Sequence, residues 1–229
     1  MSWWLEACQS PSESVLAQAL ARQSQLTKPT GSLSELESVA VTLASLQNTV
    51  KPKIDRPWIT IFAGDHGVME ENISAYPQVV TRQMLQNFAT GGACISVIAK
   101  EYQAKLQVID CGSVGEAYEY VGVERHCIRA GTANFAQTTA MTEAECEAAF
   151  ALGQKSVEDA IAYGADIYVA GEMGIGNTCS ASAVACFLLA EPAEKLTGVG
   201  TGIRTDQLIH KKQVIDQALS RHAQYVGND

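Results

Sequence analysis

Hydrophobic positions follow two different periods along the chain, and the two periods alternate. The nearly continuous apolar run at 58–63 is typical of a buried strand in a parallel sheet, and strands are also predicted at 106–110 and 167–169. Stretches whose apolar residues lie three and four positions apart are typical of amphipathic helices, and they come before, between and after these runs. Strands that alternate with helices predict an α/β fold, with a Rossmann-like, doubly wound parallel sheet and helices on both faces.

Two amphipathic stretches come before the first strand. Ser10, Pro11 and Glu13 have the order of a helix start, with a capping serine, a proline in the first turn and a glutamate three residues after the cap. Ser32 and Glu35 repeat the capping pattern. The predicted apolar faces carry Val15, Leu16, Ala19 and Leu20 in the first helix, and Leu33, Leu36, Val39, Ala40, Leu43 and Leu46 in the second.

The second half of the chain carries further boundary signals. Thr142 and Glu145 form a capping box for a helix that runs towards a stop at Gly164. Residues 196–202 are expected to form a further strand, and a final helix is expected to start at about Thr205.

The stretch 166–189, DIYVAGEMGIGNTCSASAVACFLL, predicts a strand, a glycine-rich turn and a helix in immediate succession. Gly171, Gly174 and Gly176 would leave backbone N–H groups over the end of the strand, where the helix dipole also favours an anion. The spacing is nearly that of a P-loop, but Asn177 stands where the P-loop lysine would be, so a monophosphate fits better than a triphosphate. A plain strand-to-helix turn, with glycines for close packing, accounts for the pattern equally well.

Other polar residues are expected near the same end of the sheet. Asp65 and His66 are flanked by glycines after the first strand, where open α/β sheets place their ligands. A structural role in the loop explains Asp65 equally well and His66 better. A second glycine-rich stretch, at Gly198, Gly200 and Gly202, should face the same crevice. Lys211 or Lys212, about two turns into the final helix, could add a cation there.

A candidate pocket for an aromatic heterocycle comes from the segment after the first strand. Tyr76, Gln83 and Met84 could line a flat apolar slot with one polar handle. Leu85 and Phe88 follow at helical spacing and are expected in the core.

Composition narrows the partners and the organisation. Sixteen basic and twenty-five acidic side chains give a formal net charge of −9, which argues against nucleic acid and anionic membranes as partners. With 229 residues, 47% of them hydrophobic, the chain can bury a sizeable core. We expect residues 1–50 to form a small helical domain or layer, and residues 51–229 to form the α/β substrate-binding domain.

Further exclusions come from residue spacing. No stretch is long and apolar enough to span a bilayer, and the first residues show no signal-type pattern, so we expect a cytoplasmic protein. The seven cysteines lack C-x-x-C spacing and are expected to be reduced and mostly buried. None of the four histidines sits at ligand spacing with another histidine or a cysteine pair, so we expect neither a metal nor a cofactor.

Four motifs, taken together, resemble those of the nicotinate-nucleotide:dimethylbenzimidazole phosphoribosyltransferases of cobalamin biosynthesis, the CobT family. They are KPTGSLSELE (28–37), FAGDHGVMEENISAYPQVVTRQMLQNFATGGACISVIA (62–99), GEMGIGNT (171–178) and GTG (200–202), and the similarity extends over essentially the whole chain. The resemblance implies transfer of phosphoribose from nicotinate mononucleotide to 5,6-dimethylbenzimidazole, giving α-ribazole 5'-phosphate and nicotinate. It also implies a homodimer with a Rossmann-like large domain and a small helical domain.

The resemblance also implies roles for residues that match the motifs. It puts Tyr76, Gln83 and Met84 in the benzimidazole pocket with Glu172 and Met173 close by, and Gly174, Gly176, Asn177, Gly200, Gly202 and Lys211 around the phosphate and ribose of the nucleotide. Proteins of this family continue past the equivalent of Asp229, and the glutamate regarded as their general base lies in that part. Glu172 is then the carboxylate expected to orient the nucleophile or to act as a weaker base.

Two alternatives from other functional classes stay open. One is a non-catalytic protein that binds benzimidazole or a nucleotide, because the expected base is absent from the chain. The other is a P-loop-like nucleotide-binding protein, which the asparagine at position 177 disfavours.

Overall fold

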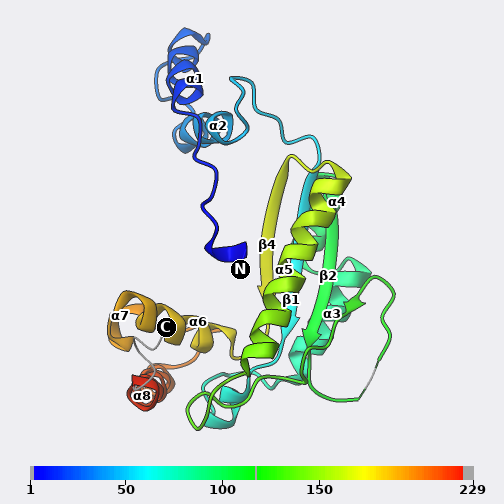
Figure 1. Ribbon diagram of the computed structural model, residues 1–229, viewed down its shortest axis with the longest axis vertical. Coiled ribbons are helices and arrows are strands. Elements are labelled where there is room, and N and C mark those ends of the chain that lie inside the picture. Colours follow the sequence, from blue (N-terminus) through cyan, green and yellow to red (C-terminus); the bar gives the residue numbers. More distant parts are fainter. Residues whose placement is uncertain (1–2, 117, 224–229) are drawn as a thin grey trace. The chain divides into compact units, whose positions relative to one another are not determined.

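The computed structural model describes residues 3–116 and 118–223, and the chain separates into two compact units, Met1–Asp55 and Arg56–Asp229 (Figure 1). Each unit has its own hydrophobic core.

The first unit is helical. It contains a short 3₁₀ helix, η1 (Trp3–Leu5), and the helices α1 (Glu13–Gln25) and α2 (Glu35–Leu46). Its core consists of small and β-branched residues of both helices: Val15, Ala19, Val41 and Ala44. The two predicted helices are therefore confirmed, but most of the leucines of their predicted apolar faces are exposed: Leu16, Leu20, Leu33, Leu36 and Leu46.

Both predicted helix caps in this unit were placed two residues too early. Ser12, not Ser10, caps α1, because its hydroxyl accepts a hydrogen bond of 3.3 Å from the N–H of Val15, the first buried residue of the helix. Ser34, not Ser32, occupies the N-cap position of α2, and its side chain makes no capping bond. At this helix start the N–H of Leu33 donates instead to the carboxylate of Glu37, at 3.2 Å.

The second unit is built on a four-stranded parallel sheet in the order β3-β2-β1-β4. The strands are β1 (Pro57–Gly64), β2 (Lys105–Gly112), β3 (Glu124–Arg125) and β4 (Ile167–Met173). The strands predicted at 58–63, 106–110 and 167–169 are all present, and β3 is an addition from a stretch in which no element was expected. The Rossmann-like α/β fold is confirmed.

Alternate residues of β1 explain how the sheet is covered on both faces. Ile59 and Ile61 pack with residues of α3 (Val79–Thr90) and α4 (Cys94–Glu101). Thr60 points the other way and bonds to Ser156 of α5 (Glu143–Tyr163), at 2.8 Å between the hydroxyl oxygens. In Figure 1, α5 accordingly crosses the near face of the sheet, while α3 lies behind it.

The predicted ends of α5 are confirmed. Thr142 accepts from the N–H of Glu145 at 3.2 Å, and the carboxylate of Glu145 accepts from the N–H of Thr142 at 2.7 Å, which completes a capping box. Gly164 ends the helix in the left-handed region, with φ of 78°.

Helices and turns make up the described residues after β4. The helices are α6 (Asn177–Leu189), the short α7 (Ala193–Leu196) and α8 (Thr205–His222). The strand expected at 196–202 is wrong. Leu196 is instead the last residue of α7, and a turn follows that is closed by a 3.2 Å bond from the N–H of Gly202 to the carbonyl of Val199.

A short 3₁₀ helix, η2 (Gly67–Glu71), follows β1. No helix among the described residues is long and apolar enough to cross a membrane. All seven cysteines are free, but the expectation that most are buried is wrong, since only Cys179 and Cys186 are. These two are on the face of α6 that packs into the core formed with α7 and α8, whereas Cys8, Cys94 and Cys127 lie on exposed positions.

Candidate functional site

The site lies where the strand order reverses. β2 and β3 extend from one side of β1 and β4 pairs with the other, so the loops after β1 and β4 diverge from neighbouring strand ends. Ligands of doubly wound sheets bind at such a switch point. The two loops touch, because a side chain at Gly174 would collide with the carbonyl oxygen of Gly64.

The glycine turn after β4 is shorter than predicted. Gly171 pairs with Ile61 inside the sheet, so its N–H belongs to the strand and not to the turn. The turn consists of Gly174, Ile175 and Gly176, and α6 begins directly after it. Gly176 has φ of 98°, a conformation that favours glycine, and this lets the backbone enter the helix at once.

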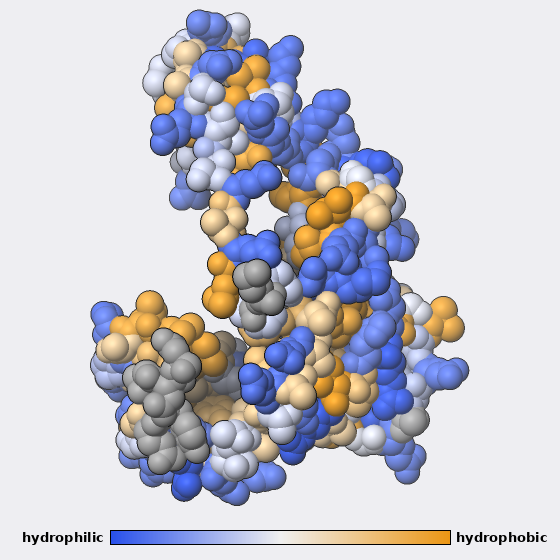
Figure 2. All heavy atoms as spheres, viewed as in Figure 1, coloured by the Kyte–Doolittle hydropathy of each residue, from blue (hydrophilic) through white to orange (hydrophobic). Residues whose placement is uncertain are grey.

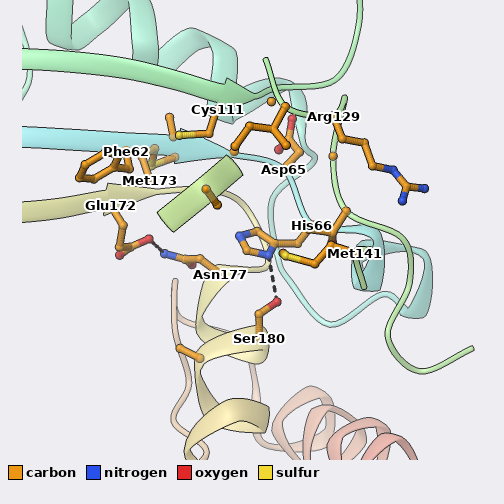
Figure 3. A pocket seen from close by; sticks show the side chains of 18 of the residues that line it. Phe62, Asp65, His66, Cys111, Arg129, Met141, Glu172, Met173, Asn177 and Ser180 are labelled. Carbon is orange, nitrogen blue, oxygen red and sulfur yellow. Dashed lines mark hydrogen bonds between the residues drawn. The ribbon is translucent and has the colours of Figure 1, made fainter. Parts of the chain in front are cut away.

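Asn177 holds the start of α6 against the end of β4. Its side-chain nitrogen donates to the carboxylate of Glu172, and its side-chain oxygen accepts from the N–H of Thr178 at 2.8 Å (Figure 3). Asn177, which stands at the P-loop lysine position, therefore uses its side chain for hydrogen bonds to nearby residues.

The cation at this turn comes from α8. Lys211 is only 1% exposed, and its ammonium donates to the hydroxyl of Thr178 at 2.7 Å and to the carbonyl of Gly198 at 3.1 Å. Burial lowers the pKa of Lys211. Among the described residues no carboxylate lies within ion-pair distance of it, whereas Lys212 pairs with Glu194 at 2.8 Å. Of the two predicted lysines, Lys211 is the one that reaches the turn.

The second glycine stretch adjoins the first. Gly200 has φ of 55°, and a side chain on it would approach the Thr178 hydroxyl to 2.7 Å and the Lys211 ammonium to 3.4 Å. Gly202 also has a positive φ, of 95°, but no atom lies near its missing side chain. The two glycine-rich stretches and a lysine were expected to lie close together, and they do so around Thr178.

A cavity of about 750 Å³ opens beside the turn, between the strand ends, α5 and α6. Its walls are mostly apolar, and its polar groups include Asp65, His66, Glu172 and Asn177 (Figure 3). Nδ1 of His66 lies 2.9 Å from the hydroxyl of Ser180, and burial lowers the pKa of His66, which favours a neutral imidazole at neutral pH. The described residues contain no cluster of three or more His, Cys, Asp or Glu side chains suited to a metal ion.

Comparison with known proteins settles the family. A family model described as phosphoribosyltransferase matches residues 8–229. The chain belongs to this phosphoribosyltransferase family.

Individual relatives agree with the family model and with the resemblance seen in the motifs. The nicotinate-nucleotide–dimethylbenzimidazole phosphoribosyltransferase of Pseudomonas fluorescens SBW25 is 53% identical over 227 residues, which are 99% of this chain and 65% of that protein. The enzyme of the same name from Pseudomonas putida W619 is 52% identical, over 96% of this chain and 63% of that protein. The crystal structure of CobT from Thermus thermophilus superposes with a TM-score of 0.84 at 46% identity, over 91% of this chain and 62% of that chain. The chain thus spans 63 to 65% of the length of these two curated relatives.

The residues expected around the benzimidazole are only partly together in this chain. Glu172 and Met173 line the cavity, but Tyr76, Gln83 and Met84 do not. Tyr76 is 50% exposed, and Met84 packs against the core cluster between the sheet and α3, which Met173 also contacts. The slot formed by Tyr76, Gln83 and Met84 stays a prediction.

The chain also carries polar residues at the site that the motif analysis did not single out. Thr178 holds Lys211, and its position directly after Asn177 matches the serine or threonine of a P-loop, which was an available signal. Ser180 and Thr81 gave no such signal, because their partners, His66 and Ile175, are distant in the sequence.

Proposed function

We propose that the chain takes part in the transfer of phosphoribose from nicotinate mononucleotide to 5,6-dimethylbenzimidazole in cobalamin biosynthesis, giving α-ribazole 5'-phosphate and nicotinate. The observation that carries the proposal is the Lys211 ammonium, buried beside the glycine turn at the start of α6 with no carboxylate to neutralise it among the described residues.

A monophosphate is the ligand that this arrangement favours. Burying an ammonium group without a counter-charge is unfavourable, and a bound anion offsets that free-energy cost. The start of a helix supplies backbone N–H donors and the positive end of the helix dipole. Gly174, Gly176, Asn177, Gly200 and Gly202 are the backbone positions around this cation that we assign to the phosphate and ribose.

The transfer itself needs little covalent chemistry from the protein. A ring nitrogen of the benzimidazole forms a bond to C1' of the ribose with inversion, and the bond from C1' to the nicotinate nitrogen breaks with its electron pair staying on nicotinate. The other benzimidazole nitrogen loses a proton, which a carboxylate can accept. Glu172, held by Asn177 at the end of β4, is assigned to orient the nucleophile and to act as a weak base.

The heterocycle slot is assigned to Tyr76, Gln83 and Met84, next to Met173. Tyr76→Ala should weaken dimethylbenzimidazole binding by about 1 to 3 kcal/mol, because aromatic contact and burial are lost. Titration calorimetry with each substrate tests the assignment. A loss of nucleotide affinity with unchanged benzimidazole affinity would contradict it.

The proposal includes a homodimer, with residues 1–50 as a small helical domain and residues 51–229 as the substrate-binding domain. Exposed apolar side chains support an interface on the second unit, since Val184, Phe187 and Leu188 of α6 are all exposed. Figure 2 shows apolar side chains gathered over α6 and α7. Sedimentation velocity tests the dimer, and a Leu188→Glu variant should favour the monomer.

The deciding experiment incubates the chain with nicotinate mononucleotide and dimethylbenzimidazole and follows the release of nicotinate. Turnover supports the transferase. Calorimetric binding of nicotinate mononucleotide without turnover supports the non-catalytic binding protein instead, and tight binding of ATP with magnesium would favour the P-loop alternative.

A further inference from the structure

Asp65 ties together the loops at the carboxyl ends of the strands. Its carboxylate is almost fully buried, and it accepts from the hydroxyl of Thr81 at 2.7 Å and from the N–H of Val114 at 2.8 Å. Its backbone N–H donates to Gly112, at 3.1 Å, and its carbonyl accepts from Thr132, at 3.0 Å. One residue therefore bonds to α3 and to two separate stretches of the chain that follows β2.

The hydroxyl of Thr81 has a fixed direction. Thr81 is 0% exposed, and its oxygen also accepts from the N–H of Ile175 at 3.0 Å. A hydroxyl has one proton to donate, and an ionised carboxylate only accepts. The Thr81 proton therefore goes to Asp65, and a lone pair remains for Ile175.

Ile175 is the central residue of the glycine turn. It is buried, and the preceding residue, Gly174, lies so close to the carbonyl of Gly64 that a side chain would not fit there. Fixing the N–H of Ile175 fixes the orientation of the peptide plane that joins Gly174 to Ile175, in a turn with a glycine on each side of Ile175. Glycine has the widest choice of backbone conformation. The hydrogen bond from the N–H of Ile175 to Thr81 thus restricts a turn that its two glycines would otherwise leave free to adopt other conformations.

We propose that Asp65 and Thr81 are positioning residues for the phosphate subsite, holding the turn 174–176 in the shape that presents its backbone to a phosphate monoester. Neither side chain needs to touch the ligand, since both act through the N–H of Ile175. This inference rests on the proposed function, because it assumes that the turn binds the phosphate of nicotinate mononucleotide.

Thr81→Val is the main test, because valine keeps the shape of threonine and removes both hydrogen bonds. We expect nicotinate mononucleotide to bind about tenfold or more weakly by calorimetry, since misplaced backbone donors lose affinity. Amide hydrogen exchange at 175–180 should accelerate about tenfold or more, because the restraint on Ile175 is gone. Thr81→Ser keeps the hydroxyl and should restore both readouts to near the wild-type values.

Thr60→Val is the matched control. Thr60 is also 0% exposed, and its hydroxyl is also shared between buried partners away from the turn: the side chains of Trp58, Gln107 and Ser156. This variant should lower the unfolding midpoint and leave both nucleotide affinity and exchange at the turn unchanged. Should Thr81→Val fail to fold, Asp65→Asn replaces it. Asparagine keeps the size of the side chain, and when its oxygen accepts from the N–H of Val114, its NH2 group faces Thr81 and donates instead of accepting. In that variant, exchange at the turn should still accelerate.

The outcomes separate the two proposals. Wild-type exchange at the turn in Thr81→Val, with wild-type nucleotide affinity, overturns the positioning role. Equal changes in Thr60→Val and Thr81→Val overturn it as well, since general destabilisation would then be the cause. If the wild-type chain does not bind nicotinate mononucleotide, the phosphate assignment fails, and faster exchange in Thr81→Val alone would then show a restraint on the turn without that ligand.

Discussion

Two buried polar networks, one beneath α5 and one at the carboxyl ends of the strands, are built from the same kinds of hydrogen bond but stabilise different parts of the structure. Beneath α5, Thr60, Gln107, Ser156 and Tyr168 bond to one another at 2.8 to 3.0 Å, and all of them belong to regular strands and a helix. At the strand ends, the chain of bonds through Asp65 terminates on backbone N–H groups of loops. The first arrangement fixes how a helix lies on the sheet. The second fixes the shape of a loop, which is where a ligand can be bound.

The largest expected effect comes from changing the loop backbone itself. Gly176→Val places a branched side chain at φ of 98°, with its Cβ about 3.2 Å from side-chain atoms of His66 and Met69. Nicotinate mononucleotide binding should fall below detection, and the strain should reduce the free energy of unfolding by about 1 to 3 kcal/mol. Calorimetry and urea unfolding measure the two effects.

Gly153 provides the control for that variant. It lies within α5, and nothing surrounds its missing side chain. Gly153→Ala should keep wild-type affinity and raise stability by about 0.5 to 1 kcal/mol through helix propensity. Retained nucleotide binding in Gly176→Val would remove the turn from the phosphate site.

The next effect is that of the buried cation. Lys211→Met should weaken nicotinate mononucleotide binding by about 1.5 to 3 kcal/mol, roughly 10- to 100-fold, because a charged hydrogen-bond donor to the phosphate is lost. Lys212→Met removes only a surface ion pair with Glu194 and should change affinity little. Equal losses in the two variants would point to long-range charge and not to a specific contact.

A smaller effect, on stability alone, is expected beneath α5. Ser156→Ala removes a hydroxyl that lies within hydrogen-bond distance of Thr60, Gln107 and Tyr168, which should reduce the free energy of unfolding by about 1 to 3 kcal/mol. Nucleotide affinity should not change. A loss of affinity measured by calorimetry would show that the two networks are coupled, and the distinction between them would fail.

The smallest effect is a dependence of stability on pH. Burial is the main cause that raises the pKa of Asp65, so the folded state holds this proton more tightly than the unfolded chain. The resulting stabilisation is complete below the unfolded pKa of about 3.9 and is lost as the pH rises through the folded value. In urea unfolding at pH values rising from about 4, Asp65→Asn should remove this decrease in stability.

Glu145 should show the opposite sign. Hydrogen bonds from Thr142 lower the pKa of Glu145, so its contribution is present above the unfolded pKa and is lost as the pH falls through the folded value. Glu145→Gln should therefore remove an increase in stability with pH. The same slope in both variants would contradict the assigned burial effect at Asp65.

The sequence predicts best those helix boundaries that depend on residues close together in the chain. The cap of α5 needs only Thr142 and Glu145, three residues apart, and its end needs only Gly164. The caps of α1 and α2 were missed by two residues because each region offers serines at both positions, and packing decides between them. The strand expected at 196–202 failed because its apolar residues are few and glycines allow a turn.

The networks could not be predicted in the same way. Thr81 and Ile175 are 94 positions apart, and Thr60 and Ser156 are 96 apart. A single sequence offers no signal that pairs one buried hydroxyl with another group at such a separation. The lysine was predictable to within one residue, because a helix at that place carries two candidates and only the rotation of α8 decides which one faces inward.

The rotation of α8 that turns Lys211 inward also has a consequence for how position 211 should vary among related sequences. Lys211, Val214, Ile215 and Ala218 are the buried residues of α8, and they form a single stripe in which three of the four members are ordinary core residues. Packing alone would favour leucine or methionine at the first of these positions. Without selection for an anion, mutation should therefore drift towards an apolar residue there, and the chain would gain stability from the change. On the proposed function, the residue at this position serves as a marker, within a set of related sequences, for which lineages have kept the phosphate site and which have kept only the fold.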